Sequence, residues 1–174
     1  MEEQYAELRH KDGYITALMN REIDIPINEI WPLLSEESER VKWLAPGTID
    51  LYVGGKVDLD FKDSYVLVES EVTACEAPRV LAFSWSGKDD PLRPIRFELA
   101  EIENGTRISL TVSIPDSEVV ARSCAGWEAH LTMLQAVAAG ASVKFPIDRF
   151  KACQKQFEQQ VTQLMMTSMP FVRL

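Results

Sequence analysis

The chain has 174 residues, 46% apolar and 26% charged, which excludes a disordered chain and fits one domain with a single core. Its net charge of −9, with no basic run, argues against binding to nucleic acid or to an anionic membrane. No apolar run approaches the roughly 20 residues that span a bilayer. Three widely separated cysteines, Cys75, Cys124 and Cys153, indicate neither a disulfide framework nor a zinc site and favour a reducing cytoplasm.

The start of the chain predicts a leader, one strand and two short helices. Residues 1–13 are polar and mixed in charge, so we expect a loose leader that is not a signal peptide. Residues 14–25 are rich in β-branched and apolar side chains and predict a strand. Apolar residues at helical spacing predict a short helix at 27–34 and a second one at 39–45.

From residue 48 the apolar residues recur with a period of two, which predicts a series of strands. A Gly-Gly pair, a Pro turn and the Asn104-Gly105 hairpin signal separate them. Near the end of the series, apolar and polar residues alternate strictly, as in an antiparallel sheet that is covered on one face. The expected strands are residues 48–53, 56–61, 64–75, 80–85, 95–99 and 108–114, with a turn at Lys62-Asp63 and a long loop at 86–94.

Residues 116–140 predict a long amphipathic helix, which we expect to be the longest in the chain. Asp116 and Ser117 can cap its first free amides, and Gly140 can end it. A lone helix with one apolar face needs a surface to cover, and the preceding strands provide one. The apolar stripe consists of Val120, Cys124, Trp127, Leu131, Leu134 and Ala138.

A last amphipathic helix follows, so the expected organisation is a leader at 1–13, one domain at 14–144 and a trailing segment at 145–174. This helix opens at Asp148. Its stripe could pack on the same domain or form a homodimer contact, and the sequence leaves both interpretations open. The stripe consists of Phe150, Cys153, Phe157, Val161 and Leu164.

Several runs of residues occur in an order typical of one family. IPINEIWPLLSEESERVKWLAPG has Trp31 and Trp43 at the two tryptophan positions, and the GG of LYVGGKVDLDF follows. ESEVTACEAPRVLAFSW and NGTRISLTVSIP match a strand pair and a hairpin, and GWEAHLTMLQAVAAG opens a final helix at Gly126 and Trp127. This order resembles domains similar to the activator of Hsp90 ATPase, which belong to the START-like, or SRPBCC, superfamily.

The resemblance covers about residues 15–164 and implies an α+β helix-grip fold of the START/Bet v 1 type. In that fold a curved antiparallel sheet of about six or seven strands wraps around a long C-terminal helix. Two short helices follow the first strand, and Trp31 and Trp43 would be their packing anchors.

The residues that could act in catalysis are few. The sequence contains no nucleophile elbow, dinucleotide fingerprint or phosphate-binding loop. With only His10 and His130, a His-rich metal site is excluded, and a Ser-His-Asp triad would have to use His130. His130 lies on the shoulder of the helix stripe, where it is either a boundary histidine with a satisfied hydrogen bond or a group that faces a cavity. Glu69 and Glu71 share one strand face, which favours a solvated outer surface over an acid-base pair.

A cavity between the long helix and the sheet is the expected binding site, because a curved sheet under a helix rarely closes completely. Large aromatic side chains there could hold a flat or acyl ligand, or they could simply fill the core. The candidate lining residues are Phe83, Trp85, Phe97, Trp127, His130, Met133 and Leu134.

The resemblance implies a ligand-binding scaffold, and three hypotheses follow from it. The first is a non-enzymatic cytoplasmic protein that binds a small hydrophobic molecule and needs no cofactor or metal. The second is a protein-interaction module related to the Hsp90 ATPase activators, with a chaperone as partner and a role in the stress response. The third is an enzyme similar to polyketide cyclases and aromatases, in which His130 would act on the ligand.

Overall fold

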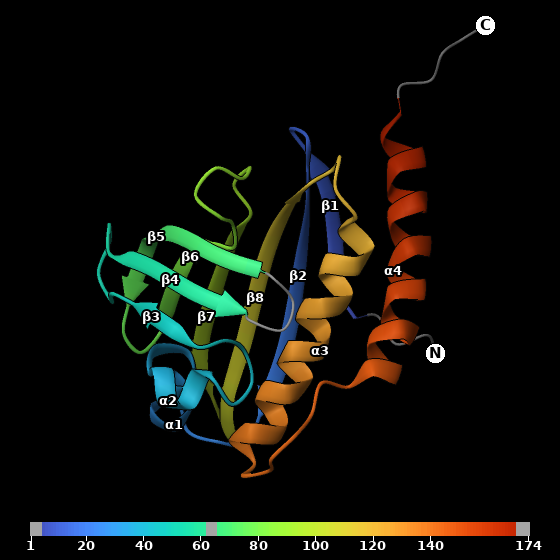
Figure 1. The fold of residues 1–174 in the computed structure, drawn as a ribbon. Coiled ribbons are helices and arrows are strands. Elements are labelled where there is room, and N and C mark those ends of the chain that lie inside the picture. Colours follow the sequence, from blue (N-terminus) through green and yellow to red (C-terminus); the bar gives the residue numbers. More distant parts are fainter. Residues whose placement is uncertain (1–4, 62–65, 170–174) are drawn as a thin grey trace, which may run out of the picture.

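The computed structural model describes residues 5–61 and 66–169, and in it a curved antiparallel sheet wraps around one long helix (Figure 1). Eight strands form this sheet in the order β1-β2-β8-β7-β6-β5-β4-β3. The α+β helix-grip architecture is therefore confirmed. The sheet has eight strands, whereas about six or seven were expected. The strands are β1 (Glu7–Lys11), β2 (Tyr14–Ile23), β3 (Gly47–Ile49), β4 (Lys56–Phe61), β5 (Val66–Glu76), β6 (Val80–Ser84), β7 (Pro94–Ile102) and β8 (Gly105–Pro115).

Strand β8 lies between β2 and β7, and its residues alternate strictly between the two faces of the sheet. Its buried residues Ile108, Leu110 and Val112 face the core, while the residues between them lie on the outer face. The hairpin at Gly105 joins β7 to β8 as expected. Gly105 has a φ of +147°, and a Cβ there would lie 2.0 Å from the carbonyl oxygen of Ile23, so only glycine fits. β8 also pairs with β2, which brings the start of the domain against its last strand.

Helix α3 (Val120–Ala138) packs on β2 and β8, and its stripe faces the core as predicted (Figure 1). Trp127, Leu131 and Leu134 are all buried. The predicted cap is wrong, because α3 begins after Val119 with no side-chain cap bond. Asp116 instead lies 2.8 Å from Nε2 of His10, so its carboxylate already has a partner on β1.

The two short helices, α1 (Ile27–Ser35) and α2 (Glu37–Arg40), follow β2 as expected. The second spans residues 37–40 and not the predicted 39–45, since the chain at Lys42 and Trp43 continues in tighter turns with i→i−3 hydrogen bonds. Trp43 is buried, and its indole Nε1 donates to the carbonyl of Leu33 at 2.7 Å. Its predicted role as a packing anchor therefore fits its surroundings, while Trp31 is only partly buried.

Helix α4 (Ile147–Ser168) is longer than α3, so the expectation that α3 is the longest helix is wrong. It runs beside α3 and against β1, at the edge of the sheet away from β3 to β5 (Figure 1). Cys153 and Phe157 are completely buried there, and the ring of Phe157 lies 6.1 Å from that of Tyr5. Residues of this stripe therefore pack on α3 and β1 of the same chain.

Several predicted boundaries differ from the structure. The segment expected to be a loose leader contains strand β1, whose residues alternate between partly buried and exposed. The expected strand at 48–53 is shorter, and Leu51 to Val53 are exposed. The predicted turn at Lys62-Asp63 and the start of a strand at Ser64 lie outside the described residues. No helix in the described ranges has the length and apolar character needed to cross a membrane.

Candidate functional site

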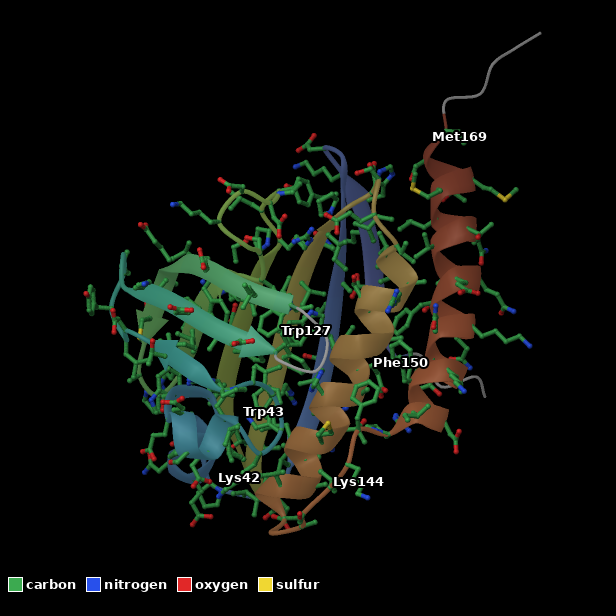
Figure 2. All side chains as sticks on the ribbon, in the orientation of Figure 1. Lys42, Trp43, Trp127, Lys144, Phe150 and Met169 are labelled. Carbon is green, nitrogen blue, oxygen red and sulfur yellow. The ribbon has the colours of Figure 1, made fainter. Side chains whose placement is uncertain are left out.

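A hollow of about 510 Å³ opens between the first half of α3, the adjoining ends of β4 and β5, and the start of α4. Figure 2 labels two of its residues, Trp127 on α3 and Phe150 on α4. Residues at the strand ends form one side of its wall, and the connection before α4 and the start of α4 form the other. Its lining residues are Phe61, Val66, Trp85, Arg122, Ser123, Gly126, Trp127, His130, Phe145 and Phe150.

Aromatic rings form most of the wall. The rings of Trp85 and Trp127 meet edge to face at 4.8 Å, and Phe61 lies 6.5 Å from Trp85. On the other side Phe145 lies 5.6 Å from Phe150. Such tilted and edge-to-face contacts hold the rings in place, and the faces and edges of the rings that line the hollow can contact a ligand. The hollow is therefore a preformed, mostly apolar surface.

His130 is the one titratable imidazole in this wall. Its Nδ1 lies 2.8 Å from the carbonyl oxygen of Trp43, and a carbonyl can only accept, so Nδ1 carries the proton and donates it. Burial lowers the pKa of His130, and the hydrogen bond to Trp43 opposes that shift. The ring is thus neutral near pH 7, and Nε2, which has no hydrogen-bond partner among the described residues, is left as an acceptor.

Three of the seven predicted lining residues, Trp85, Trp127 and His130, lie together in the hollow. Phe83, Phe97 and Leu134 are instead buried in the core, where other side chains cover them. Met133 is partly buried and packs against the core outside the hollow. The periodicity of apolar residues predicts which face of each helix or strand is buried. It does not predict whether a residue on that face lies in the closed core or beside the hollow.

The remaining lining residues were not predicted, for reasons that differ between them. Phe61 and Val66 stand at strand ends, where alternation no longer indicates a neighbour. Phe145 lies in the connection before α4, where it is the only aromatic residue in a break of small and mixed side chains. Arg122 and Ser123 are on the first turn of α3, where Arg122 lies away from the stripe and Ser123 lies on its polar shoulder. Folding brings these segments together, so no local pattern could show them as one site.

Behind α3, on the side of α4, a buried carboxylate joins three elements. Glu128 is completely buried and accepts from Arg21 of β2 at 2.7 Å and from Arg149 of α4 at 2.6 Å. The Arg149 guanidinium contacts both carboxylate oxygens, and this hydrogen bonding raises the pKa of Arg149. The thiol of Cys153 donates to the same carboxylate. Because its oxygens are occupied, Glu128 stabilises the helix pair and does not act in the hollow.

The cysteines have the properties expected of inert thiols. Burial raises the pKa of Cys124 to about 12 and, with the hydrogen bond to Glu128, that of Cys153 to about 11. Glu69 and Glu71 are exposed on the outer face of β5, in agreement with the prediction of a solvated outer surface. No group of three or more potential metal-binding side chains occurs in the described part of the chain.

Similar folds occur in solved structures. CalU16 from Micromonospora echinospora has a TM-score of 0.74 and 20% identity, over 92% of this chain and 98% of that one. A conserved protein of unknown function from Enterococcus faecalis has a TM-score of 0.75 and 20% identity over 91% of each chain. A protein from Bordetella parapertussis has a TM-score of 0.70 and 24% identity, over 92% and 94%. Identities at this level show the shared fold alone.

A search among curated proteins finds no match to the chain. The sequence pattern of the family described as "Activator of Hsp90 ATPase homolog 1-like protein" matches residues 24–139, which span the sheet from the end of β2 together with all of α3. Together with the helix-grip fold, this match shows that the chain belongs to the family of Activator of Hsp90 ATPase homolog 1-like proteins, within the SRPBCC superfamily.

Proposed function

We propose that the chain binds a small hydrophobic molecule with a ring system in the hollow beside Trp127. The observation that supports this most is the wall itself, in which the Trp85 and Trp127 rings lie 4.8 Å apart beside Phe61 and Phe145. A volume of about 510 Å³ is within the range of small-molecule sites. An apolar surface of this kind gains free energy when a flat apolar body displaces water from it.

The few polar groups in the wall would orient such a ligand. The free Nε2 of neutral His130 is an acceptor, so it favours a ligand hydroxyl or N–H group on the ring system. Ser123 adds a hydroxyl that can donate or accept. This pattern, a mostly apolar wall with a small number of placed polar groups, is typical of ligand sites.

Gly126 allows a direct test. It lies in the wall, within α3, and a Cβ built there meets no atom within 4 Å, so a larger side chain would enter the hollow. We would titrate the wild type, Gly126→Ala and Gly126→Met with the neutral fluorescent probe N-phenyl-1-naphthylamine. Both substitutions remove a helix-interior glycine and favour the helix by up to about 1 kcal/mol, so a loss of binding cannot be attributed to unfolding.

We expect the wild type and Gly126→Ala to bind the probe, and Gly126→Met to bind at least about tenfold more weakly while unfolding at the same or higher denaturant concentration. Equal binding by all three proteins would show that the hollow is not the site. A wild type that binds neither this probe nor any molecule retained in native mass spectrometry would contradict the proposed function itself.

Catalysis on the bound molecule is a second candidate, and the neutral His130 favours it. Its free Nε2 could accept a proton from a carbon next to a ligand carbonyl, as a ring-closing enzyme requires. Deuterium exchange at the α-carbons of 2-tetralone, followed by NMR, would detect this step. Faster exchange with the wild type than with His130→Asn would support the enzyme, and equal rates would leave binding without catalysis.

A further inference from the structure

Arg122 differs from the other arginines of the described chain, because its side chain has no hydrogen-bond or ion-pair partner among the described residues. It is exposed, and it lines the hollow at the first turn of α3. The partners of the other described arginines are carboxylates or, for Arg40, backbone carbonyls.

The charge of the hollow is opposite to that of the whole chain. The net charge is −9, yet no aspartate or glutamate occurs among the lining residues that the structure describes. His130 is neutral, so Arg122 is the one charged side chain among the described residues of the lining. The first turn of α3 contains no acidic residue either, and its amides add the partial positive charge of a helix N-terminus. The hollow therefore combines aromatic walls with a cation at its rim that no described acidic side chain neutralises.

We infer that the ligand of this hollow is an amphipathic organic acid, with its ring system against Trp85 and Trp127 and its anionic group on the Arg122 guanidinium. This inference rests on the proposed function and names the ligand class. A planar guanidinium presents paired N–H donors that match a carboxylate or sulfonate, and a partly desolvated pair of this kind is stronger than a neutral hydrogen bond. A ligand with no anionic group would leave the arginine unpaired beside an apolar surface.

Two probes with closely related ring systems can separate the two parts of this inference. 1-Anilinonaphthalene-8-sulfonate carries an anionic group, and N-phenyl-1-naphthylamine is the same framework without it. We would measure the dissociation constant of each for the wild type, Arg122→Gln and Arg122→Lys, at low and at high salt. Arg96→Gln is the matched control, because Arg96 is exposed on β7 outside the hollow and its replacement changes the net charge by the same amount.

We expect Arg122→Gln to bind the sulfonate about tenfold more weakly and the neutral probe with unchanged affinity. Arg122→Lys should fall between wild type and Arg122→Gln, since lysine keeps the charge but not the paired donors. High salt should weaken the sulfonate in the wild type more than in Arg122→Gln, and Arg96→Gln should resemble the wild type.

Unchanged sulfonate affinity in Arg122→Gln, or an equal loss for both probes, would overturn the role of Arg122 while leaving an apolar binding site intact. The same conclusion would follow if Arg96→Gln weakened the sulfonate as much as Arg122→Gln, because the effect would then be one of net charge. A wild type that binds neither probe would overturn this inference, and if native mass spectrometry also found no retained molecule, the proposed function would fail with it.

Discussion

The carbonyl oxygen of Trp43 accepts the Nδ1 proton of His130 at 2.8 Å, and this bond joins the segment after α2 to the middle of α3. The indole of the same tryptophan donates to Leu33, so Trp43 is held at its backbone and at its side chain. The consequence for the site is chemical, because the bond assigns the proton to Nδ1 and leaves Nε2 of this lining residue as an acceptor. A packing residue thus sets the hydrogen-bonding character of a site residue.

His130 should make the folded chain less stable in acid. The pKa of His130 is lower in the folded chain than in the unfolded chain. Below the unfolded value of about 6.5, His130 therefore binds a proton in the unfolded chain but stays neutral in the folded one. Its contribution is therefore fully present above about pH 6.5 and is lost as the pH falls, with a slope of at most about 1.4 kcal/mol per pH unit.

The variant His130→Asn keeps an N–H donor for Trp43 but does not titrate. Urea unfolding of both proteins between about pH 5 and 8 gives the difference in their unfolding free energies, from which the other titrating groups cancel. We expect the wild type to lose stability relative to the variant on acidification. A difference that stays constant over this range would mean that His130 protonates freely in the folded chain.

Phe145 should contribute to binding more than to folding. Its side chain is in the hollow and it is 38% exposed, with ring contacts to His130 at 5.5 Å and to Phe150. Phe145→Ala should lower the affinity for N-phenyl-1-naphthylamine about fivefold, which corresponds to one aromatic contact of about 1 kcal/mol. Val53→Ala, at an exposed apolar residue outside the hollow, is the control. If both variants bound like the wild type, Phe145 would not contact the ligand.

Replacement of Arg40 by lysine should destabilise the folded chain. Its guanidinium is buried and donates to the carbonyls of Leu34 and Gly47, so it ties the end of α1 to the start of β3. Burial lowers the pKa of Arg40, which is the direction expected for a cation without a buried carboxylate partner. Lysine cannot reach both carbonyls, and we expect Arg40→Lys to lower the unfolding free energy by about 2 kcal/mol.

Exposed Arg96→Lys should change the unfolding free energy by less than about 0.5 kcal/mol, which makes it the control for Arg40→Lys. Guanidinium unfolding curves measure both variants. Equal, small effects would show that water or a shifted backbone satisfies the two carbonyls when arginine is absent.

The sheet and the site differ in how far the sequence predicts them. The alternation around Leu110 predicts a buried strand face because the period of burial is a local property of an extended chain. Strand β1 has no such signal: His10 and Leu8 are only partly buried at the sheet edge, among charged neighbours. The partners of Trp127 in the hollow come from strand ends and from the connection before α4, which tertiary packing alone brings together.

The pair formed by Glu128 and Arg149 should be the strongest single link between α3 and α4. Glu128→Gln removes the buried charge and leaves two arginines, Arg21 and Arg149, without their counter-ion. Breaking a buried pair in this way costs about 3 kcal/mol or more, whereas an exposed pair is worth less than about 1 kcal/mol. Glu22→Gln is the matched control, because Glu22 pairs with Arg107 on the exposed face of the sheet.

We expect Glu128→Gln to lower the unfolding free energy by about 3 kcal/mol and to increase amide exchange throughout α4, with Glu22→Gln close to the wild type. The double variant Glu128→Gln/Arg149→Gln should recover part of the lost unfolding free energy, because it removes one of the two arginines that no longer have a counter-ion. If Glu128→Gln were as stable as Glu22→Gln, and α4 exchanged no faster, the contacts of Phe157 and Cys153 would be sufficient to hold α4. The wall that Phe150 contributes to the hollow would then be independent of the buried charge.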